Sequence, residues 1–302
     1  MFWDRVIRPV TVDATLQALA AEGERARIVA GGTDVLVELQ RGVKPTATLI
    51  DVSALRELKY VRPDGDDLVI GGLATHNDVL ASPFARDAAL PLAQACIEVG
   101  APQIRARGTI TGNLVTASPA NDTIAPLLAL DARLTLRSLQ GERSVTLAEF
   151  YSGFRSTVLR PDELVTEIRF RALDARRRGL FLKLGLRRAQ AISVIDLAFV
   201  VAFAPDGTVA EARIALGCVA PTVIRAAHAE RAIVSTVLDD AACARAGRAA
   251  LDDAAPIDDL RGSADYRRTT LQAMVARGLR RLADGREADG YPVTPVLLET
   301  PA

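Results

Sequence analysis

Apolar and polar residues follow two spacings in the first half of the chain, and each spacing predicts one type of element. Residues 11–21 place apolar side chains at helical spacing, which predicts a helix capped by Thr11 or Asp13. Helices are also predicted at 88–99 and 123–130. Short apolar runs bounded by turn residues predict strands at 27–30, 48–52, 67–72 and 133–137.

The pattern changes after the charged run 174–179, which has no apolar face and is the expected domain boundary. Beyond it, apolar runs predict strands at 181–186, 193–204 and 209–216, with a turn at 205–207. Helical spacing returns at 226–237 and 264–282. We therefore expect a second, smaller α+β unit, of a size that is ordinary for a domain.

Composition narrows the class of protein. The 302 residues are 49% hydrophobic, and 37 Lys and Arg balance 37 Asp and Glu, so no basic field predicts binding to nucleic acid or to an anionic membrane. The opening segment is not expected to be a signal peptide, because Arg5 and Arg8 interrupt it. The longest apolar stretch, 192–204, is too short for a transmembrane helix. We expect a soluble, cytoplasmic protein.

Few side chains suit metal or redox chemistry. The three cysteines (Cys96, Cys218 and Cys243) are far apart and predict neither a disulfide framework nor an iron–sulphur cysteine run. With two histidines, His76 and His228, the chain can hardly assemble a zinc site. Redox chemistry by this chain would therefore require an organic cofactor.

Two glycine-bearing segments suggest a ligand. The first, AGGTD at 30–34, follows a predicted strand and is either a structural turn or a set of backbone donors for an anion. Its spacing fits neither the Rossmann nor the P-loop motif. The second, 108–121, lacks apolar periodicity and is expected to be an ordered loop facing a ligand or solvent. It gathers several polar donors: Thr109, Thr111, Asn113, Thr116 and Ser118.

Asp122 follows the second segment at the head of a predicted helix. It is either the N-cap of that helix or an acceptor for ligand hydroxyls, such as those of a ribityl chain. Donors for a pyrophosphate and an acceptor for polyol hydroxyls are together what a dinucleotide such as FAD requires.

Several motifs occur in the order found in one family. They include AGGTDVLVELQRG (30–42), LIDVSAL (49–55), IGGLATHNDVLASP (70–83), QIRARGTITGN (103–113), ASPANDTIAPLLALDA (117–132), PDELVTEIRF (161–170), KLGLRRAQAIS (183–193) and RGSADYRR (261–268). Over roughly residues 1–282 the chain resembles the FAD-binding (medium) subunit of the xanthine dehydrogenase and carbon monoxide dehydrogenase family of molybdenum hydroxylases.

The resemblance implies an α+β fold. Residues 1–173 would form a PCMH-type FAD-binding domain of the vanillyl-alcohol oxidase superfamily, with subdomains at about 1–55 and 56–173. Residues 179–284 would form a domain like the carbon monoxide dehydrogenase flavoprotein C-terminal domain, followed by a tail at 285–302.

The resemblance also implies a cofactor site without catalytic residues or metal ligands. Two segments would hold the pyrophosphate: Ala30, Gly31, Gly32, Thr33, Asp34 and Val35, and Thr109, Ile110, Thr111, Gly112 and Asn113. Asp122 would bind ribityl or ribose hydroxyls. Val165 and Lys183 match positions beside the flavin or adenine, although Lys183 also reads as a solvated strand lysine. Ile192 and Ser193 would approach the isoalloxazine.

The chain departs from the family pattern QIRNRGTIGGN at two positions, Ala106 and Thr111. A threonine is strained at position 111 if that site needs positive φ, but adds a donor if only a small side chain is needed. Arg105 and Arg107 could pair with phosphate, or they could be surface or partner contacts. We interpret His76 as structural and expect Tyr266 to pack in the core.

The leading hypothesis is an electron-transfer subunit that binds FAD non-covalently. It would take electrons from [2Fe-2S] clusters of a small subunit, fed by a molybdopterin-containing large subunit, and pass them to NAD, a quinone or another acceptor. A dimer of heterotrimers is expected from the resemblance. The alternatives are a self-sufficient flavin oxidase or reductase, and a non-enzymatic scaffold with a degenerate flavin site.

Overall fold

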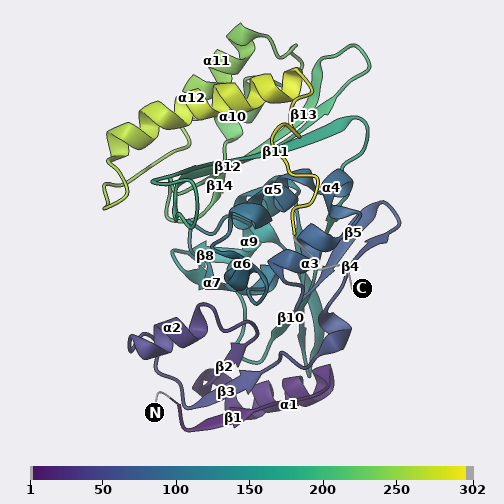
Figure 1. Cartoon of the computed structure of the whole chain (residues 1–302), viewed down its shortest axis with the longest axis vertical. Coiled ribbons are helices and arrows are strands. Elements are labelled where there is room, and N and C mark those ends of the chain that lie inside the picture. The colour runs from purple at the N-terminus through teal and green to yellow at the C-terminus, as the bar shows by residue number, and fades with distance from the viewer. Residues whose placement is uncertain (1–2, 297–302) are drawn as a thin grey trace.

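The computed structural model describes residues 3–296. Three main sheets follow one another along the long axis of the molecule in chain order, with the N-terminal sheet at one end and the C-terminal sheet at the other (Figure 1). No helix among residues 3–296 is both long enough and apolar enough to cross a membrane.

The first sheet is small and parallel. Its strands are β1 (Arg5–Ile7), β3 (Thr48–Asp51) and β2 (Ala26–Val29), in that order. Helix α1 (Val12–Glu22) begins at Thr11, whose side chain accepts a hydrogen bond from the Ala14 amide, as a helix cap should. Leu16 and Leu19 of α1 share a core with Ile50. The 3-10 turn η1 (Gly23–Arg25) precedes β2, and α2 (Val35–Gln40) follows the first glycine segment.

The second sheet has five antiparallel strands. Their order is β4 (Val61–Asp64), β5 (Asp67–Gly71), β10 (Leu164–Arg171), β6 (Arg133–Ser138) and β7 (Gly141–Thr146). A core that includes Ile70, Leu134 and Ile168 joins this sheet to the surrounding helices. The short elements here are η2 (Arg56–Leu58), α3 (His76–Ala81), α4 (Ala85–Ala88), α5 (Leu90–Glu98), α6 (Pro102–Arg105), α7 (Ile110–Thr116), α8 (Ile124–Ala129), α9 (Leu147–Phe150), β8 (Tyr151–Gly153) and β9 (Ser156–Thr157).

The third sheet belongs to the C-terminal part. It runs in sequence order through β11 (Arg177–Gly185), β12 (Ser193–Phe203), β13 (Val209–Gly217) and β14 (Ile224–Arg225). The helices α10 (Ala227–Arg231), α11 (Asp240–Ala249) and α12 (Ala264–Ala283) follow, with α12 lying across one face of the sheet (Figure 1). On the other face, Ala198 and Val200 belong to the core of the second sheet. The N-terminal and C-terminal parts are therefore packed together.

Most predicted elements are present within a few residues of their predicted bounds. Three elements and one buried-residue prediction differ from the structure. Segment 108–121, expected to be a loop, contains α7, and the predicted helix 226–237 is only the five-residue α10. Strand β11 begins at Arg177, inside the charged run expected to be a boundary. Tyr266 was assigned to the core wrongly: it is 50% exposed, whereas Arg267, next in the helix, is 1% exposed.

Candidate functional site

A cavity of about 1100 Å³ lies where the first sheet, the second sheet and the β11–β12 connection meet. It is as large as the upper end of ordinary ligand pockets, about 300–1,000 Å³, so it suits an extended ligand. Both glycine segments line it, as do Asp122 and residues 190–192. The fold thus brings together segments that are up to about 160 residues apart in the chain, as the span from 30 to 192 shows.

The first glycine segment connects β2 to α2 and is pressed against the second. A Cβ added at Gly31 would lie 2.0 Å from the carbonyl oxygen of Arg107, so no larger residue fits there without a backbone shift. Gly32 adopts a φ of 74°, in the left-handed region that glycine tolerates. Burial, followed by the nearby Glu38 carboxylate, raises the pKa of Asp34. The glycines are therefore required by close backbone packing at the cavity wall.

The second glycine segment is a capped helix start. Thr109 is the N-cap of α7 and accepts a hydrogen bond from the Gly112 amide at 2.9 Å. Asn113 is held by the Thr123 hydroxyl at 2.5 Å and by the Asn121 side chain, which donates to its carbonyl at 2.7 Å. These polar bonds hold the segment in place. Because the segment has no apolar periodicity, its sequence pattern gave no helical signal.

Thr111 lies inside α7, where the backbone is right-handed helical, so the β-branched side chain is not strained. Its hydroxyl oxygen is buried and has no hydrogen-bond partner among the described residues. The alternative that required positive φ at this position is therefore wrong, and the hydroxyl is left with capacity to bond a ligand.

Asp122 is not a helix cap, because α8 has Thr123 as its N-cap residue and no side-chain cap. The carboxylate is 5% exposed and lines the cavity. One oxygen accepts from Lys183 Nζ at 2.6 Å and the other from the Ser193 hydroxyl at 2.6 Å. Burial raises the pKa of Asp122, while Lys183 and Ser193 oppose that rise.

The predicted site residues separate into two groups. Those that line the cavity are Ala30, Gly31, Gly32, Thr33, Asp34, Val35, Thr109, Thr111, Gly112, Asn113, Asp122 and Val165. The side chain of Ile110 is instead buried in the core of the second sheet. Lys183 reaches Asp122 from a second cavity of about 600 Å³, and its side chain is only 7% exposed, so it is not a solvated lysine. Ile192 is 67% exposed at the cavity wall, and Ser193 is fully buried.

His76 is a buried residue at the cavity wall, whereas Arg105 has a role in the fold that the sequence did not suggest. The His76 ring is 2% exposed at the cavity wall, and its Nδ1 has no partner among the described residues. Burial and, next, the charge of Arg105 lower the pKa of His76 to about 4, so the ring is neutral at pH 7. Arg105 donates to the carbonyls of Ile97 and Val99, so it fixes the end of α5.

In the wall formed by residues 155–165, sequence reasoning predicted only Val165. Arg155, Arg160 and Leu164 line the cavity there, near Val165. Gly72 lies against this strand so closely that a Cβ would be 2.3 Å from the Val165 carbonyl oxygen. The motif PDELVTEIRF was the available signal, but it does not by itself indicate which residues face a cavity.

The cavity fits FAD in size and chemistry. Its volume is about 1100 Å³, the backbone of two glycine segments lines it, and Thr111 offers an unpartnered hydroxyl. Asp122 places a carboxylate at the cavity wall. Among residues 3–296, no group of three or more His, Cys, Asp or Glu could hold a metal ion.

Comparison with known proteins gives the same family on sequence and on structure. Residues 3–170 match the model of the FAD binding domain in molybdopterin dehydrogenase, and residues 181–282 match the carbon monoxide dehydrogenase flavoprotein C-terminal domain. The nicotinate dehydrogenase FAD-subunit of Eubacterium barkeri is 35% identical over 70% of this chain and 72% of its own length. The carbon monoxide dehydrogenase medium chain of Hydrogenophaga pseudoflava is 32% identical over 90% of this chain and 94% of its own.

The structural likeness is equally extensive. A chain of carbon monoxide dehydrogenase from Hydrogenophaga pseudoflava superposes with a TM-score of 0.89 at 34% identity, over 94% of this chain and 98% of that one. The predicted α+β class is confirmed. From the matched models, the relatives and the shared fold, we conclude that the chain belongs to the family of FAD-binding medium subunits of the molybdenum hydroxylases, and is the flavin subunit of an oxidoreductase.

Proposed function

We propose that this chain carries electrons through a non-covalently bound FAD, from iron–sulphur clusters of a partner subunit to NAD, a quinone or another acceptor. The observation that carries the proposal is the single cavity in which both glycine segments and the buried Asp122 meet. Bound there, a flavin would supply the ability to accept electrons in pairs and release them singly.

The residues divide the work of binding. We assign the pyrophosphate to the backbone of residues 30–35 and 109–113, with Ile110 contributing only through its backbone because its side chain is in the core. We assign ribityl or ribose hydroxyls to Asp122, and we place Val165 beside the flavin or adenine. Lys183 acts through Asp122, since its ammonium group donates to that carboxylate.

We propose the same domain organisation that the sequence predicts. The FAD-binding domain takes residues 1–173, with subdomains at about 1–55 and 56–173, and the C-terminal domain takes 179–284. The separate first, second and third sheets support these divisions. The predicted tail, 285–302, lies partly outside the described residues.

We propose two partners, a small iron–sulphur subunit and a large molybdopterin subunit, assembled as a dimer of heterotrimers in the cytoplasm. Relatives named as medium chains, and one named as a subunit of a 6-hydroxypseudooxynicotine dehydrogenase complex, support a multi-subunit enzyme. Substrate oxidation would then take place in the partner, and no general base is assigned to this chain.

The test compares the isolated chain with the chain purified from its native host. The isolated chain should bind FAD yet fail to oxidise purines, aldehydes, carbon monoxide or N-heterocycles, whereas the native preparation should contain two further chains. Oxidation of such a substrate by the isolated chain, free of molybdenum and iron, would support the self-sufficient flavoenzyme instead. A chain that binds no flavin would support the scaffold.

A further inference from the structure

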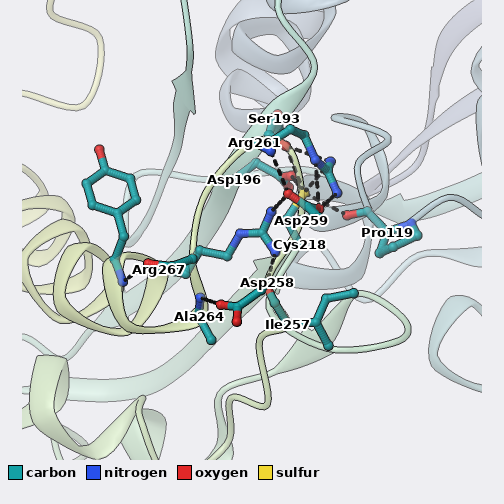
Figure 2. Close-up of polar contacts among 12 residues, drawn as sticks. Pro119, Ser193, Asp196, Cys218, Ile257, Asp258, Asp259, Arg261, Ala264 and Arg267 are labelled. Atoms are coloured by element: carbon teal, nitrogen blue, oxygen red, sulfur yellow. Dashed lines mark hydrogen bonds and ion pairs between the residues drawn. The ribbon is translucent and has the colours of Figure 1, made fainter.

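A polar network connects the C-terminal segment 257–267 to the cavity wall around Asp122; Arg267 and Ser193 are buried in it, whereas Asp259 and Arg261 are partly exposed. Figure 2 shows Arg261 and Arg267 converging on Asp259, with Ser193, Cys218 and Pro119 close to Arg261. The motif RGSADYRR supplies both arginines, and the sites assigned so far leave them without a role.

Asp259 forms the fixed end of this network. It accepts from Arg261 Nη2 at 2.6 Å and from Arg267 Nη2 at 2.7 Å, and Arg267 is itself anchored to the Ile257 carbonyl at 2.7 Å. Burial acts to raise the pKa of Asp259, but the hydrogen bonds from both arginines outweigh it and hold the pKa well below its usual range. The carboxylate is therefore ionised, and the guanidinium of Arg261 is held in one orientation.

The other end of Arg261 fixes Ser193. Arg261 Nη1 donates to the Ser193 carbonyl at 2.9 Å, and the thiol of Cys218 donates to the same carbonyl at 3.3 Å. Ser193 is the first residue of β12, where the register with β11 shifts. Ser193 pairs with Gly185 of β11 beside this shift, whereas the pairing of β12 with β13 begins only at Asp196, so the orientation of Ser193 depends partly on such contacts.

Ser193 in turn fixes Asp122 and the loop that carries it. Its hydroxyl donates to Asp122 at 2.6 Å, opposite the oxygen that Lys183 occupies. The Cys218 amide donates to the Pro119 carbonyl at 3.0 Å, which ties the same loop to the C-terminal sheet. A carboxylate with a donor on each oxygen cannot rotate freely, so its remaining acceptor capacity points in a fixed direction.

We propose that Arg261 is a positioning residue of the cofactor site: it holds Ser193, and Ser193 holds the carboxylate of Asp122 in the orientation that receives the ligand's hydroxyl groups. This inference rests on the proposed role of Asp122 in binding FAD. Arg261 is not among the residues that line the cavity, so it acts on the site through Ser193 rather than by touching the cofactor.

The experiment is a double-mutant cycle on FAD affinity. The full-length chain is prepared as wild type, Arg261→Gln, Ser193→Ala and the double variant, and the Kd for FAD and its dissociation rate are measured by flavin fluorescence. Loss of a hydrogen bond to a charged group predicts that each single variant raises Kd about tenfold. Because both act through one carboxylate, the double variant should raise Kd no further than about twofold beyond the larger single effect.

Arg268→Gln is the matched control. Arg268 lies near the start of α12 (Ala264–Ala283), in the same motif as Arg261, and donates to the carbonyls of Ala254 and Leu251 rather than to Asp259 or Ser193. The Arg268→Gln chain should bind FAD with the same Kd as wild type. Urea unfolding of all variants without FAD separates lost stability from lost affinity.

The outcomes separate the positioning role of Arg261 from the cofactor contact of Asp122. An unchanged Kd in folded Arg261→Gln, or single effects that multiply in the double variant, would overturn the positioning role. Should Arg261→Gln not fold, Arg261→Lys keeps one donor near Ser193 and is expected to bind FAD with a Kd between those of wild type and Ser193→Ala. If Asp122→Ala itself binds FAD like wild type, the proposed cofactor contact fails; if it weakens FAD while Arg261→Gln does not, only the positioning role fails.

Discussion

The two walls of the cavity are built in different ways. The N-terminal wall relies on backbone: two glycine segments pack so closely that a Cβ at Gly31 would lie 2.0 Å from a carbonyl oxygen. The C-terminal wall relies on side chains, since Asp122 receives hydrogen bonds from Lys183 and Ser193, which are 61 and 71 residues away in the chain. Added side-chain volume should disturb the N-terminal wall, whereas loss of a hydrogen-bond donor or acceptor should disturb the C-terminal wall. We therefore expect the two walls to respond differently to mutation.

The largest effect should come from adding a side chain to the backbone wall. Gly31→Ala forces the two glycine segments apart and should weaken FAD binding about a hundredfold, as overpacking of a tight site does. Gly153→Ala is the control, because a Cβ there meets nothing within 4 Å. Isothermal titration calorimetry with FAD measures the Kd of both variants. A Gly31→Ala chain that binds like wild type would remove the close-packed backbone from the explanation.

His76 should make the stability of the same wall depend on pH. Its folded pKa, about 4, lies below the unfolded value of 6.5, so the unfolded chain takes up the proton first as pH falls. The free energy of unfolding contributed by the neutral His76 ring is fully present above pH 6.5. It is lost as the pH falls from 6.5 to 4, by about 3 kcal/mol in all. Urea unfolding at pH 7 and pH 4 should show this loss in wild type but not in His76→Gln. Equal losses in both chains would assign it to other groups.

The side-chain wall should respond to loss of its acceptor. Asp122→Ala should raise the Kd for FAD by roughly ten- to a hundredfold, because the ligand's hydroxyl groups lose a buried charged acceptor. His76→Ala should lower stability and change FAD affinity less than Asp122→Ala does. The flavin fluorescence titration gives both Kd values. If their order is reversed, the main polar contact lies on the backbone wall.

The smallest effect concerns Thr111, whose side chain belongs to the wall that otherwise relies on backbone. Thr111→Val keeps the β-branched shape inside α7 and removes only the unpartnered hydroxyl. If that hydroxyl bonds the cofactor, FAD affinity should fall about fivefold, the effect of one ordinary hydrogen bond. Thr116→Val is a comparison, because that hydroxyl already donates to the Gly112 carbonyl. Unchanged affinity in Thr111→Val would leave the hydroxyl without a part in binding.

The same contrast explains what could be predicted from the sequence. Strand β12 is a long apolar run and helix α12 has a long periodic pattern, so both were predicted correctly. The cap of α1 was predicted as Thr11 or Asp13, and it is Thr11. Helix α7 was missed because its Gly, Thr and Asn residues have low helix propensity, and its cap and the bonds to Asn113 hold it in place.

The side-chain network was beyond sequence reasoning. The partners of Asp122 and of Arg261 come from distant segments, and spacing along the chain does not indicate that they meet. Tyr266 and Arg267 show a related difficulty. An aromatic residue was expected inside, but the helix turns the neighbouring arginine inward, where Asp259 and the Ile257 carbonyl satisfy it.

Non-covalent binding of FAD in this cavity is tested most directly by denaturing the FAD-saturated chain with acid. Neither glycine segment contains a histidine or cysteine that could tether a flavin. We predict that FAD appears in the supernatant in an amount equimolar to the chain, and that the precipitated protein is colourless. Flavin that stays with the precipitate, or a chain that takes up no flavin at saturating FAD, would contradict the prediction.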